Sequence, residues 1–333
     1  MEILNVCPST LAEGFDTYSP VARKLLFDGR AVSHVLPFDS PNNESADTEE
    51  YVRHVGRISL SGVQPKASLV LDSGNQLVRP SEGQRGRYIL KPAPTAYSLL
   101  ERKYCPANEH LSMQIASQVY HIETAANALC FFRDGEAAYL TRRFDVAPDG
   151  GKYQQEDLAS LGGLTKANGG SDYKYSNLSY EECAELISKY TKAAAVEILK
   201  FFRVVVFNYL ILNDDAHLKN FSLMNRGNGE YHLTPAYDLI NTSLHLYEPR
   251  IFALDKGLFR EGMHFSDTHT VNRKDFEEFG SRIGLSARLV SRELDFFASE
   301  HPLVHELIYR SFLSEKLKKY YWQSFNYRRT TLR

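Results

Sequence analysis

The chain has 333 residues, of which 43% are hydrophobic and 24% charged, and its formal net charge is −2. This length allows two lobes or domains with an extensive core, and a charge near zero argues against a globally cationic nucleic-acid-binding protein. The four cysteines have no C-x-x-C spacing, which argues against a zinc site or a disulfide framework.

The sequence also argues against secretion and membrane insertion. The N-terminal residues lack a basic segment followed by a long apolar one. The most apolar window, 201–212, is too short to span a membrane and contains Arg203 and Asn208. We therefore expect a cytoplasmic protein.

The first part of the chain is predicted to be rich in strands. We expect a short helix at 21–26, a strand at 31–36, and strands at 55–60 and 67–72 joined by a small-residue turn. Such a hairpin can cover nucleotide phosphates, but its single glycine is also compatible with an ordinary hairpin. A further strand ends at Lys91, where a kinase fold places its phosphate-contacting lysine; a solvated charge at a strand end is the alternative.

A helix is predicted to begin near Pro106 and to run to about Tyr120. Glu109, which we place in its first turn, would either complement the helix dipole or pair with Lys91 as the glutamate of a kinase small lobe. Strands are expected at 126–133 and 137–144. The segment 154–158 follows, where a two-lobed kinase has its hinge.

The second part of the chain is predicted to be helical. Ser179 and Glu182 form a capping-box pattern, and a helix at about 193–212 is apolar nearly all round, which predicts a buried helix. Helices at 273–283, 287–299 and from about 304 onward follow. Strands first and helices later indicate an α+β, two-lobed layout.

The C-terminal segment 309–333 combines basic and aromatic residues. A packed helix with a solvated basic face is the simpler interpretation, and a nucleic-acid or partner contact is the alternative.

The candidate active site lies between these two parts. Asp215 stands five residues before Asn220, and Asp238 follows downstream. In protein kinases an aspartate with this spacing accepts or orients the substrate hydroxyl, while the asparagine and a later aspartate hold magnesium. His217 as a metal ligand or base is the alternative, but no second histidine or cysteine stands at ligand spacing. Asp214 is predicted to be structural.

The order of these motifs resembles the HipA family of bacterial serine/threonine kinase toxins over roughly residues 55–245. The motifs are Ser59-Leu60-Ser61-Gly62-Val63-Gln64-Pro65-Lys66, Tyr88-Ile89-Leu90-Lys91, Arg142-Arg143-Phe144-Asp145, Gln155-Glu156-Asp157, Asp215-Ala216-His217-Leu218-Lys219-Asn220-Phe221-Ser222 and Ala236-Tyr237-Asp238-Leu239. The resemblance implies a two-lobed, protein-kinase-like α+β fold. Its smaller β-rich N-lobe would comprise residues 1–155 and its mainly helical C-lobe residues 156–333.

The resemblance also implies ATP and Mg²⁺ as cofactors. Asp215 would be the catalytic base, Asn220 and Asp238 the metal ligands, and Lys91 the phosphate contact. The remaining implied nucleotide-site residues are a phosphate-covering loop, two hinge contacts to adenine and three residues that line the site: Ser61, Gly62, Val63, Gln64, Pro65 and Lys66; Glu156 and Leu158; His217, Lys219 and Tyr237.

Only about 58 residues precede the phosphate loop, which resembles the short HipT-type kinases of three-component toxin–antitoxin systems. This subgroup implies a helix-turn-helix antitoxin, through which DNA is contacted indirectly, and a small HipS-like protein that supplies an N-terminal subdomain. It also implies an aminoacyl-tRNA synthetase, such as the tryptophanyl enzyme, as substrate. In the family a loop serine, here Ser59 or Ser61, is autophosphorylated and silences the kinase.

Two other functions remain open from the sequence. The chain could be a catalytically silent subunit of a DNA-bound repressor complex, or a kinase of small molecules or lipids. The presence of Lys91, Asp215, Asn220 and Asp238 argues against a silent subunit.

Overall fold

A computed structural model describes residues 4–41, 65–96, 98–263 and 270–333. Its larger sheet is antiparallel with the strand order β2-β1-β3-β5-β4. The five strands are β1 (Ala67–Leu71), β2 (Leu77–Val78), β3 (Tyr88–Pro92), β4 (Asn127–Phe131) and β5 (Ala137–Arg142). The strands predicted at 67–72, 87–91, 126–133 and 137–144 are therefore confirmed.

The alternation of side chains along these strands gives the sheet two buried faces. On one face Leu140 packs in a cluster with residues of helix α1 (Pro20–Phe27). On the other face Leu129 and Tyr139 pack with residues of helix α4 (Cys105–Gln118). The sheet thereby fixes the position of α4, and with it that of Glu109.

The strand predicted at 31–36 is wrong. Val35 forms only an isolated bridge with Phe131, and no longer ladder forms in this described segment. Pro37, which has no N–H to donate, follows directly, and this limits further pairing.

The helical part is larger and is built around α9 (Ala194–Leu210). This helix is buried over most of its length, as its apolar sequence predicts. The predicted capping box is confirmed at the start of α8 (Tyr180–Tyr190), where the Glu182 N–H donates to Ser179 Oγ at 3.2 Å and the Ser179 N–H donates to Glu182 Oε2 at 2.8 Å. The other helices of this part are α5 (Leu158–Leu161), α6 (Lys166–Gly169), α7 (Tyr173–Ser176), α10 (Arg273–Arg282), α11 (Ala287–Ala298), α12 (Pro302–Arg310) and α13 (Glu315–Thr331).

The C-terminal segment forms two helices, where the sequence predicted one from about residue 304. Ser314 caps α13 by accepting a hydrogen bond from the Leu317 N–H at 3.4 Å, so the chain restarts a helix there. Leu317, Tyr321 and Phe325 are buried at four-residue spacing, while Tyr320 and Tyr327 are exposed. The segment is a packed helix with a solvated face, in agreement with the simpler interpretation of its sequence.

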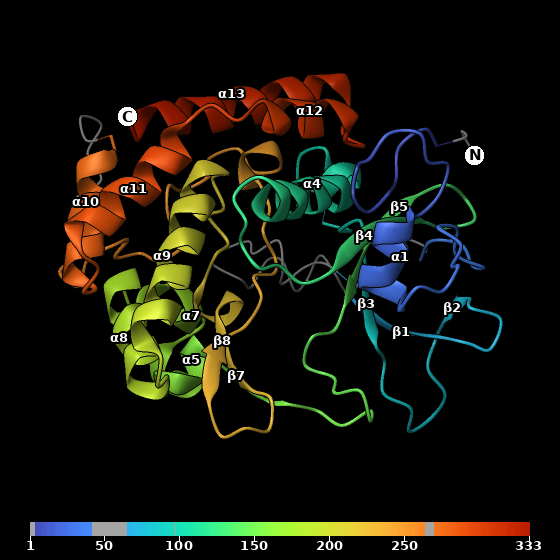
Figure 1. Ribbon diagram of the computed structural model, residues 1–333, viewed down its shortest axis with the longest axis horizontal. Coiled ribbons are helices and arrows are strands. Elements are labelled where there is room, and N and C mark those ends of the chain that lie inside the picture. Colours follow the sequence, from blue (N-terminus) through green and yellow to red (C-terminus); the bar gives the residue numbers. More distant parts are fainter. Residues whose placement is uncertain (1–3, 42–64, 97, 264–269) are drawn as a thin grey trace.

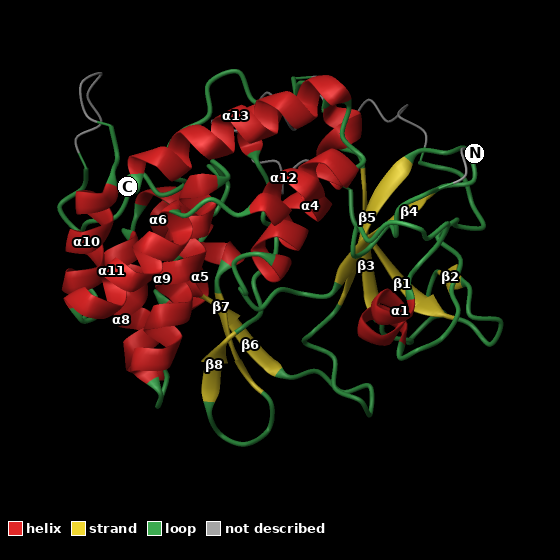
Figure 2. Cartoon of the chain, turned by 45° about the horizontal axis from the view of Figure 1, so that its top comes forward, coloured by secondary structure: helices red, strands yellow, loops and turns green. Residues whose placement is uncertain are grey.

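Figure 1 shows the five-stranded sheet on the right, α8 to α11 on the left, and α4 between them beneath α12 and α13. A smaller antiparallel sheet, β6 (Gln154–Asp157), β7 (Ser222–Asn225) and β8 (Tyr231–Leu233), lies at the bottom of the helical part (Figure 2). The predicted α+β class is confirmed. The boundary at residue 155 stays a prediction. None of the described helices is long and apolar enough to cross a membrane.

Candidate active site

A buried lysine joins the two parts of the protein. Lys91 lies on β3 and is only 5% exposed. Its Nζ donates to Glu109 Oε1 of α4 at 2.6 Å and also forms an ion pair with Asp238. The functional interpretation of Glu109 is therefore supported by geometry, although Glu109 lies just past the first turn of α4, because the helix begins at Cys105, one residue before the predicted start.

The protonation of these three groups follows from their mutual charges. Burial lowers the pKa of Lys91, but the Asp238 and Glu109 carboxylates raise it well above its ordinary value. Burial raises the pKa of Asp238, yet the charges of Lys91 and Lys66 hold it at about 2. Burial raises the pKa of Glu109 to about 7 against the attraction of Lys91. At neutral pH the lysine and Asp238 are charged, while Glu109 titrates.

The predicted catalytic loop follows the end of α9. Asp215 is 6% exposed; its N–H donates to Asn213 Oδ1 at 3.2 Å and its carbonyl accepts from the His217 N–H at 2.8 Å. The Asn220 N–H in turn donates to the His217 carbonyl at 2.9 Å, within the short 3₁₀ turn Leu218–Asn220. The main chain thus holds Asp215 and Asn220 in one compact turn.

Asn213 links this loop to the segment that carries Asp238. Its Nδ2 donates to the Asp238 carbonyl at 3.1 Å and to Asn208 Oδ1 at 3.0 Å. Asp238 has a φ of 56°, in the left-handed region that aspartate tolerates better than most residues. The sequence alone does not indicate this role of Asn213, because a bridging side chain belongs to no spacing pattern.

Asp214 has the structural position that was predicted for it. Its Oδ2 accepts from the Arg250 N–H at 3.0 Å, and its own N–H donates to Thr242 Oγ1 at 3.2 Å. These contacts connect the loop to the segments of Thr242 and Arg250.

Asn220 and Asp238 have the chemistry of a magnesium pair. Carboxylate and amide oxygens are hard ligands, and Mg²⁺ in kinases uses one or two of them together with phosphate oxygens and water. The described residues contain no cluster of three or more His, Cys, Asp or Glu suited to a metal, but this class of site does not require one. Asn220 Nδ2 is buried and has no hydrogen-bond partner among the described residues. The two residues fit the ion.

His217 is unsuited to act as a charged group. Burial lowers its pKa to about 4, although the Asp215 carboxylate raises it. Neither ring nitrogen has a hydrogen-bond partner among the described residues, and the ring meets Tyr175 edge-on at 5.1 Å. His217 is therefore neutral at pH 7.

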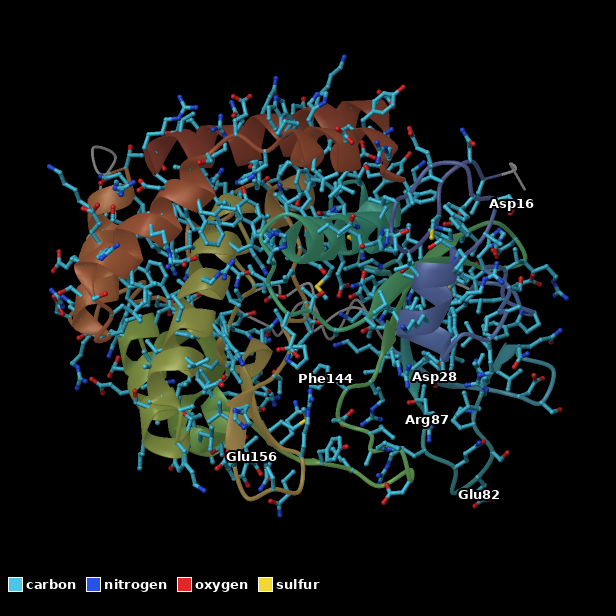
Figure 3. The ribbon with its side chains drawn as sticks, in the orientation of Figure 1. Asp16, Asp28, Glu82, Arg87, Phe144 and Glu156 are labelled. Carbon is cyan, nitrogen blue, oxygen red and sulfur yellow. The ribbon has the colours of Figure 1, made fainter. Side chains whose placement is uncertain are left out.

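A pocket of about 210 Å³ lies beside Lys91 and Asp238. The rings of Phe144 and Tyr237 lie 5.7 Å apart on its wall, and Phe144 is labelled in Figure 3. The complete lining is Lys66, Ile89, Lys91, Ala125, Thr141, Arg142, Arg143, Phe144, Asp145, Gln155, Tyr237 and Asp238. This is the best candidate nucleotide pocket. Ile89 and Phe144 stand in the motifs of the resemblance without an assigned role, and Ala125 was not singled out from the sequence.

The predicted hinge residues do not line this pocket. Glu156 is exposed, pairs with Leu223 across the small sheet and lies near the bottom of the molecule (Figure 3). Leu158 is fully buried at the start of α5. Gln155, whose side chain points to the other face of β6, lines the pocket instead.

Two further predicted residues, Tyr237 and Lys219, connect the site to neighbouring segments. Tyr237 donates its hydroxyl to the Lys219 carbonyl at 2.9 Å and lies 2.8 Å from Ser222 Oγ. Lys219 Nζ lies 3.6 Å from Asp157 Oδ2, so it connects the catalytic loop to β6.

The predicted phosphate loop is described only at its end. Pro65 and Lys66 are described, and Lys66 lines the pocket. The other loop residues lie outside the described residues: Ser59, Ser61, Gly62, Val63 and Gln64.

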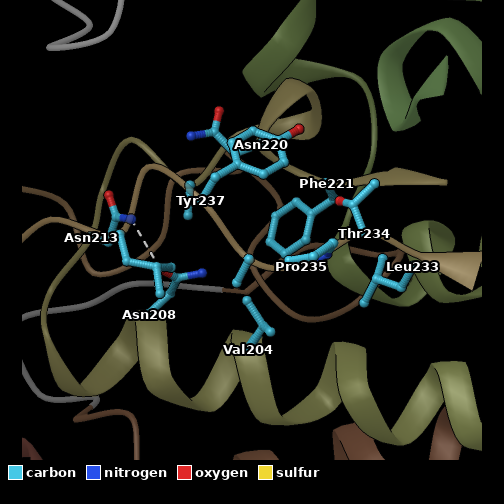
Figure 4. Close-up of a pocket in the computed structure, with 12 residues that line it drawn as sticks. Val204, Asn208, Asn213, Asn220, Phe221, Leu233, Thr234, Pro235 and Tyr237 are labelled. Atoms are coloured by element: carbon cyan, nitrogen blue, oxygen red, sulfur yellow. Dashed lines mark hydrogen bonds between the residues drawn. The ribbon is translucent and has the colours of Figure 1, made fainter. Parts of the chain in front are cut away.

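Two other hollows are poor ligand sites. The cavity of about 10 Å³ in Figure 4, between α9 and the loop of Asn220, has room for at most one water. A hollow of about 640 Å³ lies between the N-terminal segment and the α12–α13 connection, but its charges pair with one another, as in Arg310 with Glu13 at 3.4 Å and Lys318 with Glu315 at 2.8 Å.

Sequence comparisons place the chain among kinase-like proteins. The family described as the HipA-like C-terminal domain matches residues 58–302. A protein of Haemophilus influenzae named "Putative kinase" is 28% identical over 328 residues, which cover 94% of this chain and 88% of that protein. A Sinorhizobium fredii protein, "Putative kinase Y4dM", is 31% identical over 216 residues, which cover 61% of this chain and 50% of that protein.

Solved structures confirm the fold. HipA of Shewanella oneidensis, in a complex of the toxin–antitoxin system with HipB and operator DNA, matches 85% of this chain and 70% of its own with a TM-score of 0.65 and 20% identity. The proinflammatory kinase CtkA of Helicobacter pylori matches 78% of this chain and 88% of its own with a TM-score of 0.51 and 17% identity. The predicted two-lobed, kinase-like α+β fold is confirmed by these likenesses.

Proposed function

The chain belongs to the family of the HipA-like C-terminal domain, and we propose that it is a serine/threonine protein kinase (EC 2.7.11.1 type) that uses ATP and Mg²⁺. The observation that carries the proposal is the ion-paired group of Lys91, Glu109 and Asp238 beside the loop of Asp215 and Asn220. Four chain segments supply these residues, namely β3, α4, the loop of Asp215 and Asn220, and the segment of Asp238. Together they have the residue types that phosphoryl transfer requires.

Each residue has a role that its position supports. Asp215 accepts or orients the proton of the attacking hydroxyl, and Lys91 contacts the phosphates while Glu109 holds its ammonium group in place. Asn220 and Asp238 would hold magnesium, which when bound neutralises charge on the transferred phosphoryl group. Lys66, at the end of the predicted phosphate loop, adds positive charge at the same pocket. Catalysis rests on position and charge, as is usual for this reaction.

Replacing Asp215 tests the proposal directly. Asp215→Asn should reduce phosphate transfer from γ-labelled ATP to background, because the amide cannot accept the hydroxyl proton, while binding of a fluorescent ATP analogue is retained. The matched control is Asp214→Asn, in the neighbouring residue that contacts Arg250, which should keep its activity. Wild-type transfer by Asp215→Asn would refute the assignment.

We further propose that the chain is the toxin of a toxin–antitoxin system, of the short HipT type. The Shewanella HipA complex contains HipB and operator DNA, which supports a helix-turn-helix antitoxin as partner and indirect contact with DNA. The resemblance extends this to a small HipS-like partner and to an aminoacyl-tRNA synthetase as substrate, whose phosphorylation would inhibit translation and growth.

Adding the purified chain together with γ-labelled ATP to a bacterial lysate distinguishes the proposed protein kinase from a small-molecule kinase and from a silent repressor subunit. A single labelled protein band, identified by mass spectrometry as a synthetase, supports the proposed target. A band of another identity rejects the synthetase but keeps the protein kinase. Labelled small molecules without labelled protein indicate a small-molecule kinase. No labelled product at all indicates a silent repressor subunit.

Autophosphorylation at Ser59 or Ser61 is a separate part of the proposal. A phosphate adds a charge of about −1.5 to −2 beside the place where ATP phosphates would bind, and it would therefore weaken nucleotide binding. Intact mass after incubation with ATP should rise by one phosphate in the wild type and not in Ser59→Ala/Ser61→Ala. A mass that does not change in the wild type rejects this part alone.

A further inference from the structure

Tyr175 contacts the proposed catalytic carboxylate, although no sequence motif singled it out. It lies on α7, and its hydroxyl donates to Asp215 Oδ1 at 2.6 Å. Its side chain is only 2% exposed. A hydroxyl that donates to a carboxylate over this distance forms one of the stronger hydrogen bonds in proteins.

The support behind this hydroxyl is fixed. The Tyr175 N–H donates to the Asp172 carbonyl at 2.8 Å, and the Tyr175 carbonyl accepts from the Asp255 N–H at 2.9 Å. The ring is buried with Ala216 and Ala253 and meets His217 edge-on. Because main chain and ring are both held, the hydroxyl stays on Asp215 and does not swing with a flexible side chain.

Two side-chain torsions set the orientation of the Asp215 carboxylate, and a hydrogen bond that holds one of its oxygens restricts both torsions. Since the carboxylate is planar, the direction of Oδ2 is set once Oδ1 is held by Tyr175. In phosphoryl transfer the rate depends on the alignment of the attacking hydroxyl, and a displacement of about 1 Å can cost about 100-fold.

We infer that Tyr175 is a positioning residue for Asp215, which holds the carboxylate in the orientation that receives the substrate hydroxyl. The inference rests on the proposed kinase function. In the opposite role, the tyrosine hydroxyl would occupy the place of the substrate hydroxyl and block the site. An active kinase would then require that the Tyr175 side chain moves away from Asp215. Its burial and its main-chain hydrogen bonds argue against that.

Tyr175→Phe removes the hydroxyl and keeps the ring. We expect kcat for transfer from γ-labelled ATP to proteins of a kinase-inactivated lysate to fall by about 10- to 100-fold, with KM for ATP and the melting temperature nearly unchanged. The matched control is Tyr180→Phe. Tyr180 is also buried, and its hydroxyl donates to the Ala216 carbonyl, next to Asp215, at 2.9 Å. This control should keep its kcat.

Each outcome distinguishes the inference from the proposed function. Wild-type kcat in Tyr175→Phe, with Asp215→Asn inactive, overturns the inference and leaves the kinase intact. Faster transfer by Tyr175→Phe assigns the blocking role and overturns positioning. Equal losses of kcat and melting temperature in Tyr175→Phe and Tyr180→Phe assign a merely structural role. If the wild-type chain transfers no more phosphate from ATP than Asp215→Asn, both the inference and the proposed kinase function are overturned.

Discussion

At the scale of single residues, the site depends on one buried cation shared by two carboxylates. Lys91 pairs with both Glu109 and Asp238, and all three side chains are largely removed from water. Removing one partner of a buried ion pair leaves an uncompensated buried charge. The resulting loss of stability is larger than the stability that the intact pair contributes relative to a pair of apolar residues. Glu109 is the group that can relieve this cost, because its pKa already lies at about 7.

Lys91→Met should therefore destabilise the protein in a pH-dependent way. We expect a loss of unfolding free energy of about 3 kcal/mol at pH 8. The loss should be smaller at pH 6, because Glu109 without Lys91 has a still higher pKa and binds a proton in the folded state that the unfolded state does not bind. Urea denaturation at the two pH values measures this.

The control for this experiment is Lys91→Met combined with Glu109→Gln. The double variant has no carboxyl group at position 109 to titrate, so most of the difference between pH 6 and pH 8 should disappear. An equal cost of Lys91→Met at both pH values would contradict the shared-cation interpretation.

The residues found from the sequence are those whose spacing along the chain is set by the local fold. Asp215 and Asn220 share one turn, and the strand of Lys91 ends at a proline, so both features are readable in a single sequence. Tyr175 and Asn213 act through contacts that only the folded chain creates, since α7 reaches Asp215 across 40 residues. The hinge contacts Glu156 and Leu158 stay predictions, because the sequence does not show which face of β6 meets the pocket that Gln155 lines.

At the scale of elements, α4 is attached to the Asp238 segment by buried hydrogen bonds. Asn108, beside Glu109, donates from Nδ2 to the Asn241 carbonyl at 2.7 Å and accepts at Oδ1 from the Asn241 N–H at 3.2 Å. Its Nδ2 also lies 2.9 Å from His245 Nε2. These bonds fix α4, and therefore Glu109, relative to the segment that carries Asp238.

Asn108→Ala should cost about 2 kcal/mol or more of unfolding free energy, because it leaves buried main-chain groups of Asn241 without this partner. Gln118→Ala is the control on the same helix. Gln118 is half-buried and donates to the Thr10 carbonyl at 2.9 Å, so its loss should cost less than about 1 kcal/mol. Urea denaturation of both variants checks the difference, and equal costs would show that α4 has no special anchor at Asn108.

Element types were predicted best where periodicity and end signals agreed. The apolar run of α9 and the Ser179–Glu182 box are examples, since each is decided by residues close in sequence. The segment 31–36 has strand-like residues, but its sequence does not show whether a neighbouring strand is available for pairing. In the structure Val35 forms only an isolated bridge, with Phe131. The break between α12 and α13 depends on Ser314, whose capping role a helical pattern does not reveal.

At the scale of the whole molecule, three histidines are buried, and two of them, His110 and His245, connect separate segments. His110 of α4 lies 2.7 Å from the Ser9 carbonyl, His245 lies 2.9 Å from the Leu100 carbonyl, and His217 stands in the catalytic loop. Burial lowers the pKa of each from 6.5 to about 4. The folded protein therefore keeps all three neutral at a pH where the unfolded chain protonates them.

This linkage predicts that mild acid destabilises the protein. Between pH 6.5 and 4.5 the unfolded state binds up to three protons more than the folded state at the histidines. Glu109 acts in the opposite sense, because its raised pKa of about 7 gives the folded state one extra proton in this range. The net difference of about two protons corresponds to a loss of about 3 kcal/mol of unfolding free energy per pH unit of acidification.

Urea denaturation at pH 6.5, 5.5 and 4.5 measures this slope directly. Glu109→Gln should steepen it by about 1.4 kcal/mol per pH unit, since the opposing proton is removed and the three histidines remain. An unfolding free energy that stays constant or rises on acidification would show that the buried histidines are protonated in the folded state, against the burial that surrounds them.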